Sequence, residues 1–335
     1  MRAALIGVSC IALISAFFLG REEQTPPNTT PQAPGPTQVA GAQITALLVR
    51  DAQIISGDAG GRIRVWSRTK QDVKHSWFGH EGPIRTLKNL GSHFASAGAD
   101  GRVVTWQMDQ AIQRVRLKNY RLNDAYFGTD GGIFLAAERG TVARRGTRPN
   151  WIHKSIHGQG TFAIDHAPDR PLVASAGTDG FVRIWRADEG TSVSQWRASD
   201  SWVTQLAWIG NEIITADAQG EITRWTVKPS GQVLESISMA RLNSPVVAMA
   251  IHGERLAVST ADRHVRIYHW IKGIRLHGWR CDTRPAMAIA INAQLVVYGD
   301  GHGNIIQRAV KGGQSIGMLP AITRGNTPWD DLPKN

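Results

Sequence analysis

The sequence predicts an all-β protein, a seven-bladed β-propeller, and two periodic patterns support this fold class. The first is a repeated unit, as in Ala174 to Trp185. Each unit begins with a run of strand-forming residues, continues with a Gly/Asp turn, and ends with an alternating run whose last residue is large. Such units end, at spacings of 40, 39, 40, 40, 43 and 40 residues, on Trp66, Trp106, Arg145, Trp185, Trp225, Tyr268 and Arg308. A fixed period of about 40 residues is typical of propeller blades with four strands each.

The second pattern lies eleven residues after each of these ends, where a fourth strand is expected. Six of the seven positions there are large and apolar, namely Trp77, Leu117, Ile156, Trp196, Trp279 and Leu319. The exception, Ser236, belongs to the unit with three extra residues, and a shift by three reaches Met239. We therefore expect seven blades within residues 43–323, with an insertion between the third and fourth strands of blade five.

The last blade has two possible sources for its fourth strand. Gln314 to Leu319 fits that strand in register, which would complete blade seven from its own sequence. The stretch Gln38 to Ala42 is the alternative, because many propellers close with an N-terminal strand. Residues 324–335 are expected to form an exposed tail.

Blade two carries a set of residues with a recognisable spacing. Gly79-His80 opens the blade, Ser96 lies on its second strand, Asp100 in the turn and Trp106 on the third strand. This set resembles the WD40 repeat family, and the resemblance extends over the predicted blades. It implies a hydrogen-bonded tetrad that ties the loops and strands of a blade together. Blade four offers the same residue types in His157, Ser175, Asp179 and Trp185.

The sequence also departs from that family. No blade keeps the Trp-Asp dipeptide, because the four tryptophans are followed by Ser67, Gln107, Arg186 and Thr226. Blades three and seven place Arg145 and Arg308 at the ring position. The resemblance therefore implies an architecture and identifies no functional subfamily.

Charge limits the class of partner. The chain has 38 Lys and Arg against 27 Asp and Glu, a net charge of +11, and the charges of residues 1–42 cancel. A positive propeller favours acidic or envelope-associated partners. The basic residues are spread along the chain, so we do not expect a nucleic-acid partner, and we expect Arg64, Arg183 and Arg266 to be solvated on blade faces.

The N-terminal region predicts a membrane anchor and a spacer. Ala3 to Gly20 contains eighteen residues without a charge, which is long enough for a helix that spans a bilayer. We expect residues 1–21 to be a transmembrane helix, with a cleaved signal peptide as the alternative. Residues 22–42, rich in Pro and Thr, form a predicted Pro-rich linker. Because Arg2 and the amino terminus favour the cytoplasmic side, we expect a single-pass protein of the bacterial inner membrane, with the propeller in the periplasm.

Catalytic motifs are absent from the sequence. It contains no Gly-x-Ser-x-Gly, no P-loop, no zinc-ligand spacing and no Cys-x-x-Cys-His. We therefore expect a protein that is not an enzyme and has no cofactor, no metal and no catalytic residue. A propeller that held a cation would need carboxylates at the channel, for which Asp124, Asp200 and Asp282 are the candidates.

These observations predict a membrane-tethered, non-enzymatic WD40-like scaffold that binds a protein or an envelope polymer. The expected binding face carries the turns before the inner strands and includes Glu81, Asp124, Trp202, Asp282 and Arg284. Two alternatives stay open. One is an enzyme or ligand sensor of the quinoprotein or lactonase kind that uses the central channel, and the other is an envelope-assembly factor of the BamB kind.

Overall fold

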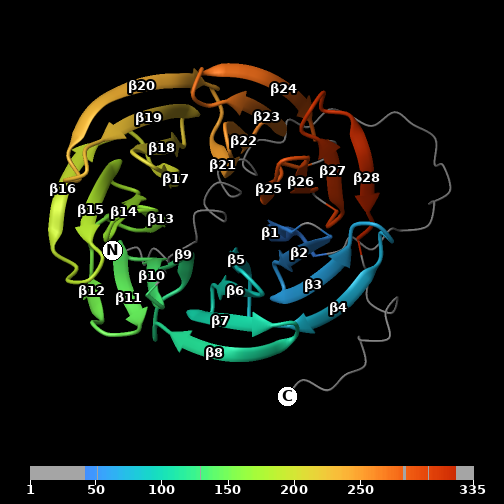
Figure 1. Ribbon diagram of the computed structural model, residues 1–335, viewed down its shortest axis with the longest axis horizontal. Coiled ribbons are helices and arrows are strands. Elements are labelled where there is room, and N and C mark those ends of the chain that lie inside the picture. The colour runs from blue at the N-terminus through green and yellow to red at the C-terminus, as the bar shows by residue number, and fades with distance from the viewer. Residues whose placement is uncertain (1–41, 51, 129, 282–283, 301, 322–335) are drawn as a thin grey trace, which may run out of the picture.

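A computed structural model describes residues 42–50, 52–128, 130–281, 284–300 and 302–321 (Figure 1). In this part of the chain, seven antiparallel four-stranded sheets stand around a ring, with one sheet per repeat. The predicted all-β, seven-bladed propeller is therefore confirmed. None of its described residues form a helix long and apolar enough to cross a membrane. The predicted anchor, nearly all of the linker, and the tail lie outside the described residues.

Each blade runs from an inner strand at the ring centre to an outer strand at the rim, in sequence order. The inner strands are β1 (Ile44–Val49), β5 (Ile84–Leu90), β9 (Leu122–Phe127), β13 (Thr161–His166), β17 (Val203–Ile209), β21 (Val246–His252) and β25 (Ile289–Ile291). The second strands are β2 (Gln53–Asp58), β6 (His93–Gly98), β10 (Gly132–Ala137), β14 (Leu172–Gly177), β18 (Glu212–Asp217), β22 (Arg255–Thr260) and β26 (Leu295–Gly299).

The third strands are β3 (Arg62–Ser67), β7 (Arg102–Gln107), β11 (Thr141–Gly146), β15 (Phe181–Arg186), β19 (Glu221–Val227), β23 (His264–His269) and β27 (Ile305–Ala309). The outer strands are β4 (Val73–Phe78), β8 (Gln110–Arg116), β12 (Trp151–His153), β16 (Ser192–Arg197), β20 (Val233–Arg241), β24 (Ile274–Arg280) and β28 (Ser315–Leu319). Because strands alternate in direction, the turns between second and third strands share one face with the loops that lead into the inner strands. We call this side the loop face.

Blade four shows how the repeat folds. The turn between β14 and β15 places Gly180 at a φ of +76°, which glycine adopts without steric cost. A Cβ atom there would lie 2.2 Å from the carbonyl oxygen of Ser199. The hairpin then pairs Val173 with Trp185, so the tryptophan falls on the buried side of the third strand. Each period of the sequence thus corresponds to one four-stranded blade and contains one such buried hairpin of second and third strands.

The core lies between neighbouring blades. Apolar residues of blade four, such as Ile184, pack against blade five residues such as Leu206 and Trp208 in one cluster. The ring closes in the same way, because Ile44 and Trp66 of blade one share a cluster with Leu319 of blade seven. All four described strands of blade seven come from its own sequence, as the Gln314 to Leu319 assignment predicted.

Blades three, five and seven depart from the regular repeat. Ile156 lies in the turn after the short β12, and Leu117 of blade two lies one residue beyond β8, so the second pattern is wrong in placing these two residues on a fourth strand. In blade five the extra residues lengthen β20, and its pairing with β19 has two register shifts where most other blades have one. Met239 is partly buried and packs against the core cluster of blades five and six. In blade seven the Arg308 guanidinium lies 5.0 Å from the ring centre of Trp279, a cation–π contact in place of the missing ring.

The expectation that Arg64, Arg183 and Arg266 are solvated is wrong. The side chain of Arg64 is 10% exposed, and its Nη1 lies 2.7 Å from the Asp58 carboxylate. Arg183 and Arg266 pair in the same way with Asp179 and Asp262. Each arginine extends along its sheet to a carboxylate at the loop face, so these side chains contribute to the internal structure of their blades.

Candidate functional site: central cavity and loop face

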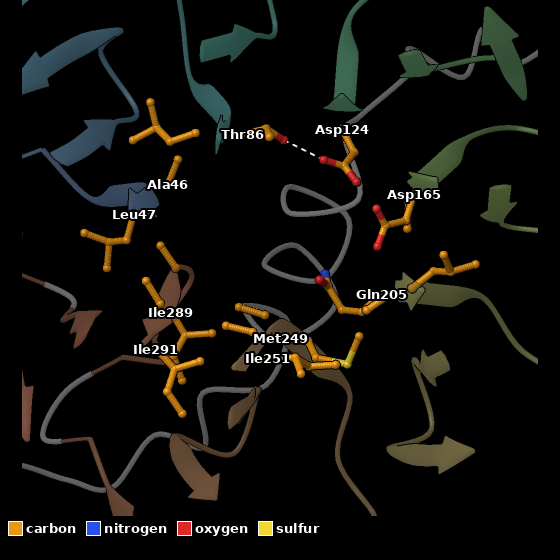
Figure 2. Close-up of a pocket in the computed structure, with 18 of the residues that line it drawn as sticks. Ala46, Leu47, Thr86, Asp124, Asp165, Gln205, Met249, Ile251, Ile289 and Ile291 are labelled. Carbon is orange, nitrogen blue, oxygen red and sulfur yellow. Dashed lines mark hydrogen bonds between the residues drawn. The ribbon is translucent and has the colours of Figure 1, made fainter. Parts of the chain in front are cut away.

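The inner strands surround a central cavity of about 670 Å³ (Figure 2). All seven blades contribute to its lining. The residues that line it differ from blade to blade, since the inner strands share less of the repeat than the third strands do. The cavity therefore has distinct sides.

Carboxylates line one side of the cavity. Asp124, on β9, accepts hydrogen bonds from the Thr86 hydroxyl at 2.7 Å and from the Ile164 backbone N–H at 3.2 Å. Asp165, on β13, accepts backbone N–H bonds from Trp208 at 2.8 Å and His166 at 2.9 Å. These bonds tie blades two to five together around the polar side of the cavity.

The charge state of this side depends on its surroundings. Desolvation inside the cavity raises the pKa of Asp165 to about 6, against the opposing influence of the Lys88 ammonium and of its backbone donors. Desolvation lowers the pKa of Lys88, but the nearby Asp124 and Asp165 carboxylates outweigh it and leave that pKa raised. Lys88 therefore keeps its positive charge at neutral pH.

Of the residues predicted to form one binding face, Glu81, Trp202 and Arg284 precede inner strands on the loop face, whereas Asp124 lines the cavity. Glu81 is exposed on the loop face and pairs with Arg102 at 2.7 Å. Trp202 lies just before β17, half-buried, with its ring edge against Phe162 at a centroid distance of 6.1 Å. Arg284 is exposed in the loop before β25, and Asp282 lies outside the described residues.

Asp124 belongs to the cavity rather than to an exposed loop, because β9 already begins at Leu122. Asp200 does not line the cavity, and its side chain, 86% exposed, pairs with Arg197 at 2.9 Å. Asp124 and Asp200 thus do not converge on a common cation. Among the described residues, no group of three or more His, Cys, Asp or Glu side chains is placed to hold a metal ion.

Sequence reasoning missed a set of arginines on the loop face. Four of the seven outer strands end there on an exposed arginine, namely Arg116, Arg197, Arg241 and Arg280. Arg197 and Arg241 have acidic neighbours, Asp200 and Glu221. Within the part of the chain that the structure describes, Arg116 and Arg280 make no ion pair. A common signal was available, because Arg197 and Arg280 each follow a fourth-strand tryptophan.

Two blades contain a complete tetrad of hydrogen bonds. In blade two, His80 contacts Asp100 through Nδ1 at 2.9 Å and Ser96 through Nε2 at 2.7 Å. The Trp106 indole N–H donates to the same Ser96 hydroxyl at 2.8 Å. Blade four repeats the arrangement, at distances of 2.8 to 2.9 Å, with His157, Asp179, Ser175 and Trp185. Both tetrads are largely buried, so they position the loop face without offering a ligand site.

A family model described as "WD domain, G-beta repeat" matches residues 71–107 and 152–186. Each matched segment contains one of the two complete tetrads. Among curated proteins, the mouse kinesin-like protein KIF21B is 24% identical over 51% of this chain and 11% of its own length. The yeast SIR4-interacting protein SIF2 is 23% identical over 64% of this chain and 44% of its own length. Actin-interacting protein 1 of Drosophila melanogaster is 21% identical over 83% of this chain and 50% of its own length.

The chain thus spans half or less of each of these relatives. Solved structures of similar shape include the β-propeller domain of Cps50 (Swd1) from Myceliophteria thermophila, with a TM-score of 0.69 and 16% identity. The computationally designed Ika8 protein has a TM-score of 0.62 at 18% identity. In both cases the match covers 81% of this chain and 97% of the other, and it shows the fold alone. The chain is a seven-bladed β-propeller in which two segments, residues 71–107 and 152–186, match the WD40 repeat model.

Proposed function

We propose that this protein is a non-enzymatic scaffold that binds an acidic protein partner through its loop face. The observation that carries the proposal is the set of exposed arginines at the ends of β8, β16, β20 and β24. Arg116 and Arg280 make no ion pair within the described residues, so their charges are available to an acidic surface, and Arg is a frequent anchor at protein interfaces. Two of the relatives are themselves named for interactions, with SIR4 and with actin.

Charge reversal on the two faces tests this proposal. The double variant Arg116→Glu and Arg280→Glu changes two exposed side chains without breaking an ion pair of the described structure. The control, Lys70→Glu with Lys272→Glu, changes two exposed residues in the turns between third and outer strands, on the opposite face. We expect the first variant to lower the yield of partner in an affinity pull-down at least tenfold and the control to leave it near the parent level. Equal losses in both variants would contradict the assignment of the face.

We further propose that the N-terminal segment tethers the propeller to a membrane, with the propeller on the periplasmic side of the bacterial inner membrane. The uncharged run from Ala3 to Gly20 supports this proposal. An arginine at the centre of such a span costs about 3 kcal/mol on insertion scales, so Ile14→Arg should release the protein from membranes washed with alkaline carbonate. The parent should stay with the membranes, and protease added to spheroplasts should digest its propeller. Release of the parent protein from the membranes would contradict the proposed tether. Protection of its propeller from protease in spheroplasts would contradict the proposed orientation.

A further inference from the structure

The central cavity has two chemically different sides (Figure 2). Blades two to five supply charged and amide side chains, including Lys88. Asp124, Asp165 and Gln205, from the same side, are labelled in Figure 2. Blades one, six and seven supply mainly apolar side chains, namely Leu47, Met249, Ile251, Ile289 and Ile291, with Thr45 and His252 as polar exceptions. A channel that served only as a water-filled centre would not need this division. It suits a ligand that is polar at one end and apolar at the other.

The polar side holds opposite charges that do not touch. Asp165 is fixed by two backbone N–H donors, which leave lone pairs on both oxygens. Lys88 and Asp165 affect one another electrostatically, yet within the described residues neither makes an ion pair shorter than 4.0 Å. Lys88 lies beside the Tyr126 ring, with its ammonium 6.0 Å from the ring centre. A cationic site and an anionic site thus face the same cavity, each without a counter-ion in contact.

We propose that the cavity binds a small zwitterion with an apolar body, of the class of aliphatic α-amino acids. The ligand ammonium pairs with Asp165, with Asp124 and the Gln205 amide oxygen nearby, and the ligand carboxylate pairs with Lys88. The aliphatic side chain then lies against Met249, Ile251 and Ile289. A ligand with a single charge would match only one of the two sites.

The size of the cavity agrees with this class. Its volume of about 670 Å³ falls within the range of about 300–1,000 Å³ that is usual for small-molecule sites. An amino acid fills only part of that space, so bridging waters complete the contacts on the polar side. The site is separate from the arginines of the loop face, and its occupancy does not depend on a protein partner.

Isothermal titration calorimetry of the full chain tests the proposal with three probes of one carbon skeleton. L-leucine carries both charges, 3-methylbutylamine lacks the carboxylate, and 4-methylpentanoate lacks the ammonium. We expect saturable binding of L-leucine, and dissociation constants about tenfold or more larger for the other two probes, because each loses a charge-assisted contact. Absence of saturable L-leucine binding, or equal affinity for all three probes, would overturn the proposal.

Two variants assign the contacts. In Asp165→Asn, L-leucine should lose its advantage over 4-methylpentanoate and keep its advantage over the amine. In Lys88→Met the pattern should be the reverse. Asp200→Asn, an exposed carboxylate away from the cavity, is the control and should bind like the parent. Identical behaviour of the two cavity variants would contradict the assigned contacts, and the three-probe series on the parent chain decides the proposal even if a variant fails to fold.

Discussion

The two tryptophan–serine pairs of blades one and two allow one prediction to be worked out with an internal reference. In blade one, the Ser56 hydroxyl accepts a hydrogen bond from Trp66 at 2.8 Å. In blade two, the Ser96 hydroxyl binds both Trp106 and His80. Both serines are fully buried. Replacing either by Ala removes the same atom from the same position of the repeat.

The expected costs differ because a different number of polar groups loses its partner. Ser56→Ala leaves the Trp66 N–H unsatisfied, and an unsatisfied buried group costs about 1–3 kcal/mol. Ser96→Ala leaves both the Trp106 N–H and the His80 Nε2 without this partner, so it should cost about 1–3 kcal/mol more. Urea titrations of the parent and both variants, followed by tryptophan fluorescence and circular dichroism, measure the free energies of unfolding. An equal loss in both variants would refute the view that the histidine adds stability through this tetrad.

Three further predictions concern charge and backbone. Burial alone would raise the pKa of Asp100, but the His80 hydrogen bond and charge lower it to about 2, and Asp179 is lowered to about 2 in the same way by His157. The stability that these carboxylates contribute is fully present above the usual pKa of 3.8 and is lost as the pH falls through about 2. The free energy of unfolding, measured by urea titration at several pH values, should therefore depend less on pH in this range in Asp100→Asn than in the parent. Arg64→Met leaves the Asp58 carboxylate buried without its cation and should cost about 3 kcal/mol or more, while Arg114→Met on the exposed β8 should leave thermal stability near that of the parent. Gly180→Ala forces a positive φ on a residue with a Cβ and should cost at least about 1 kcal/mol, which thermal unfolding would measure; an unchanged melting temperature would contradict the close approach to Ser199.

The third strands made the fold readable from the sequence. Trp66, Trp106, Trp185 and Trp225 recur because the third strands of these four blades pack a large ring between adjacent sheets. Glycines equivalent to Gly180 recur because the turn before the third strand requires a positive φ. The departures had local causes. Ile156 left the pattern because β12 has only three residues, a length that depends on the loop around it rather than on hydrophobic spacing.

The cavity was harder to predict. The inner strands share a register shift with their neighbours, but the side chains that line the channel differ from blade to blade. Asp124 was interpreted as a loop residue because Asn and Asp are frequent in turns, yet it lies on β9 and bonds to blades two and four. Lys88 and Asp165 directly follow Leu87 and Ile164 on otherwise largely buried inner strands. A charged residue within such an apolar strand is the sequence signal that could have identified the cavity. The buried Arg64 was missed because its partner Asp58 lies on the preceding strand.

The most direct test of the scaffold assignment is site-specific photocrosslinking in cells from both faces of the propeller. A photoreactive residue at Glu81 or Arg284 samples the loop face, and one at Lys70 or Lys272 samples the opposite face. All four side chains are exposed, so the positions are matched in accessibility. The proposed function predicts crosslinks to one defined protein from Glu81 and Arg284, with little from Lys70 and Lys272. Crosslinks from Lys70 and Lys272 alone, or no defined protein from any position, would contradict it.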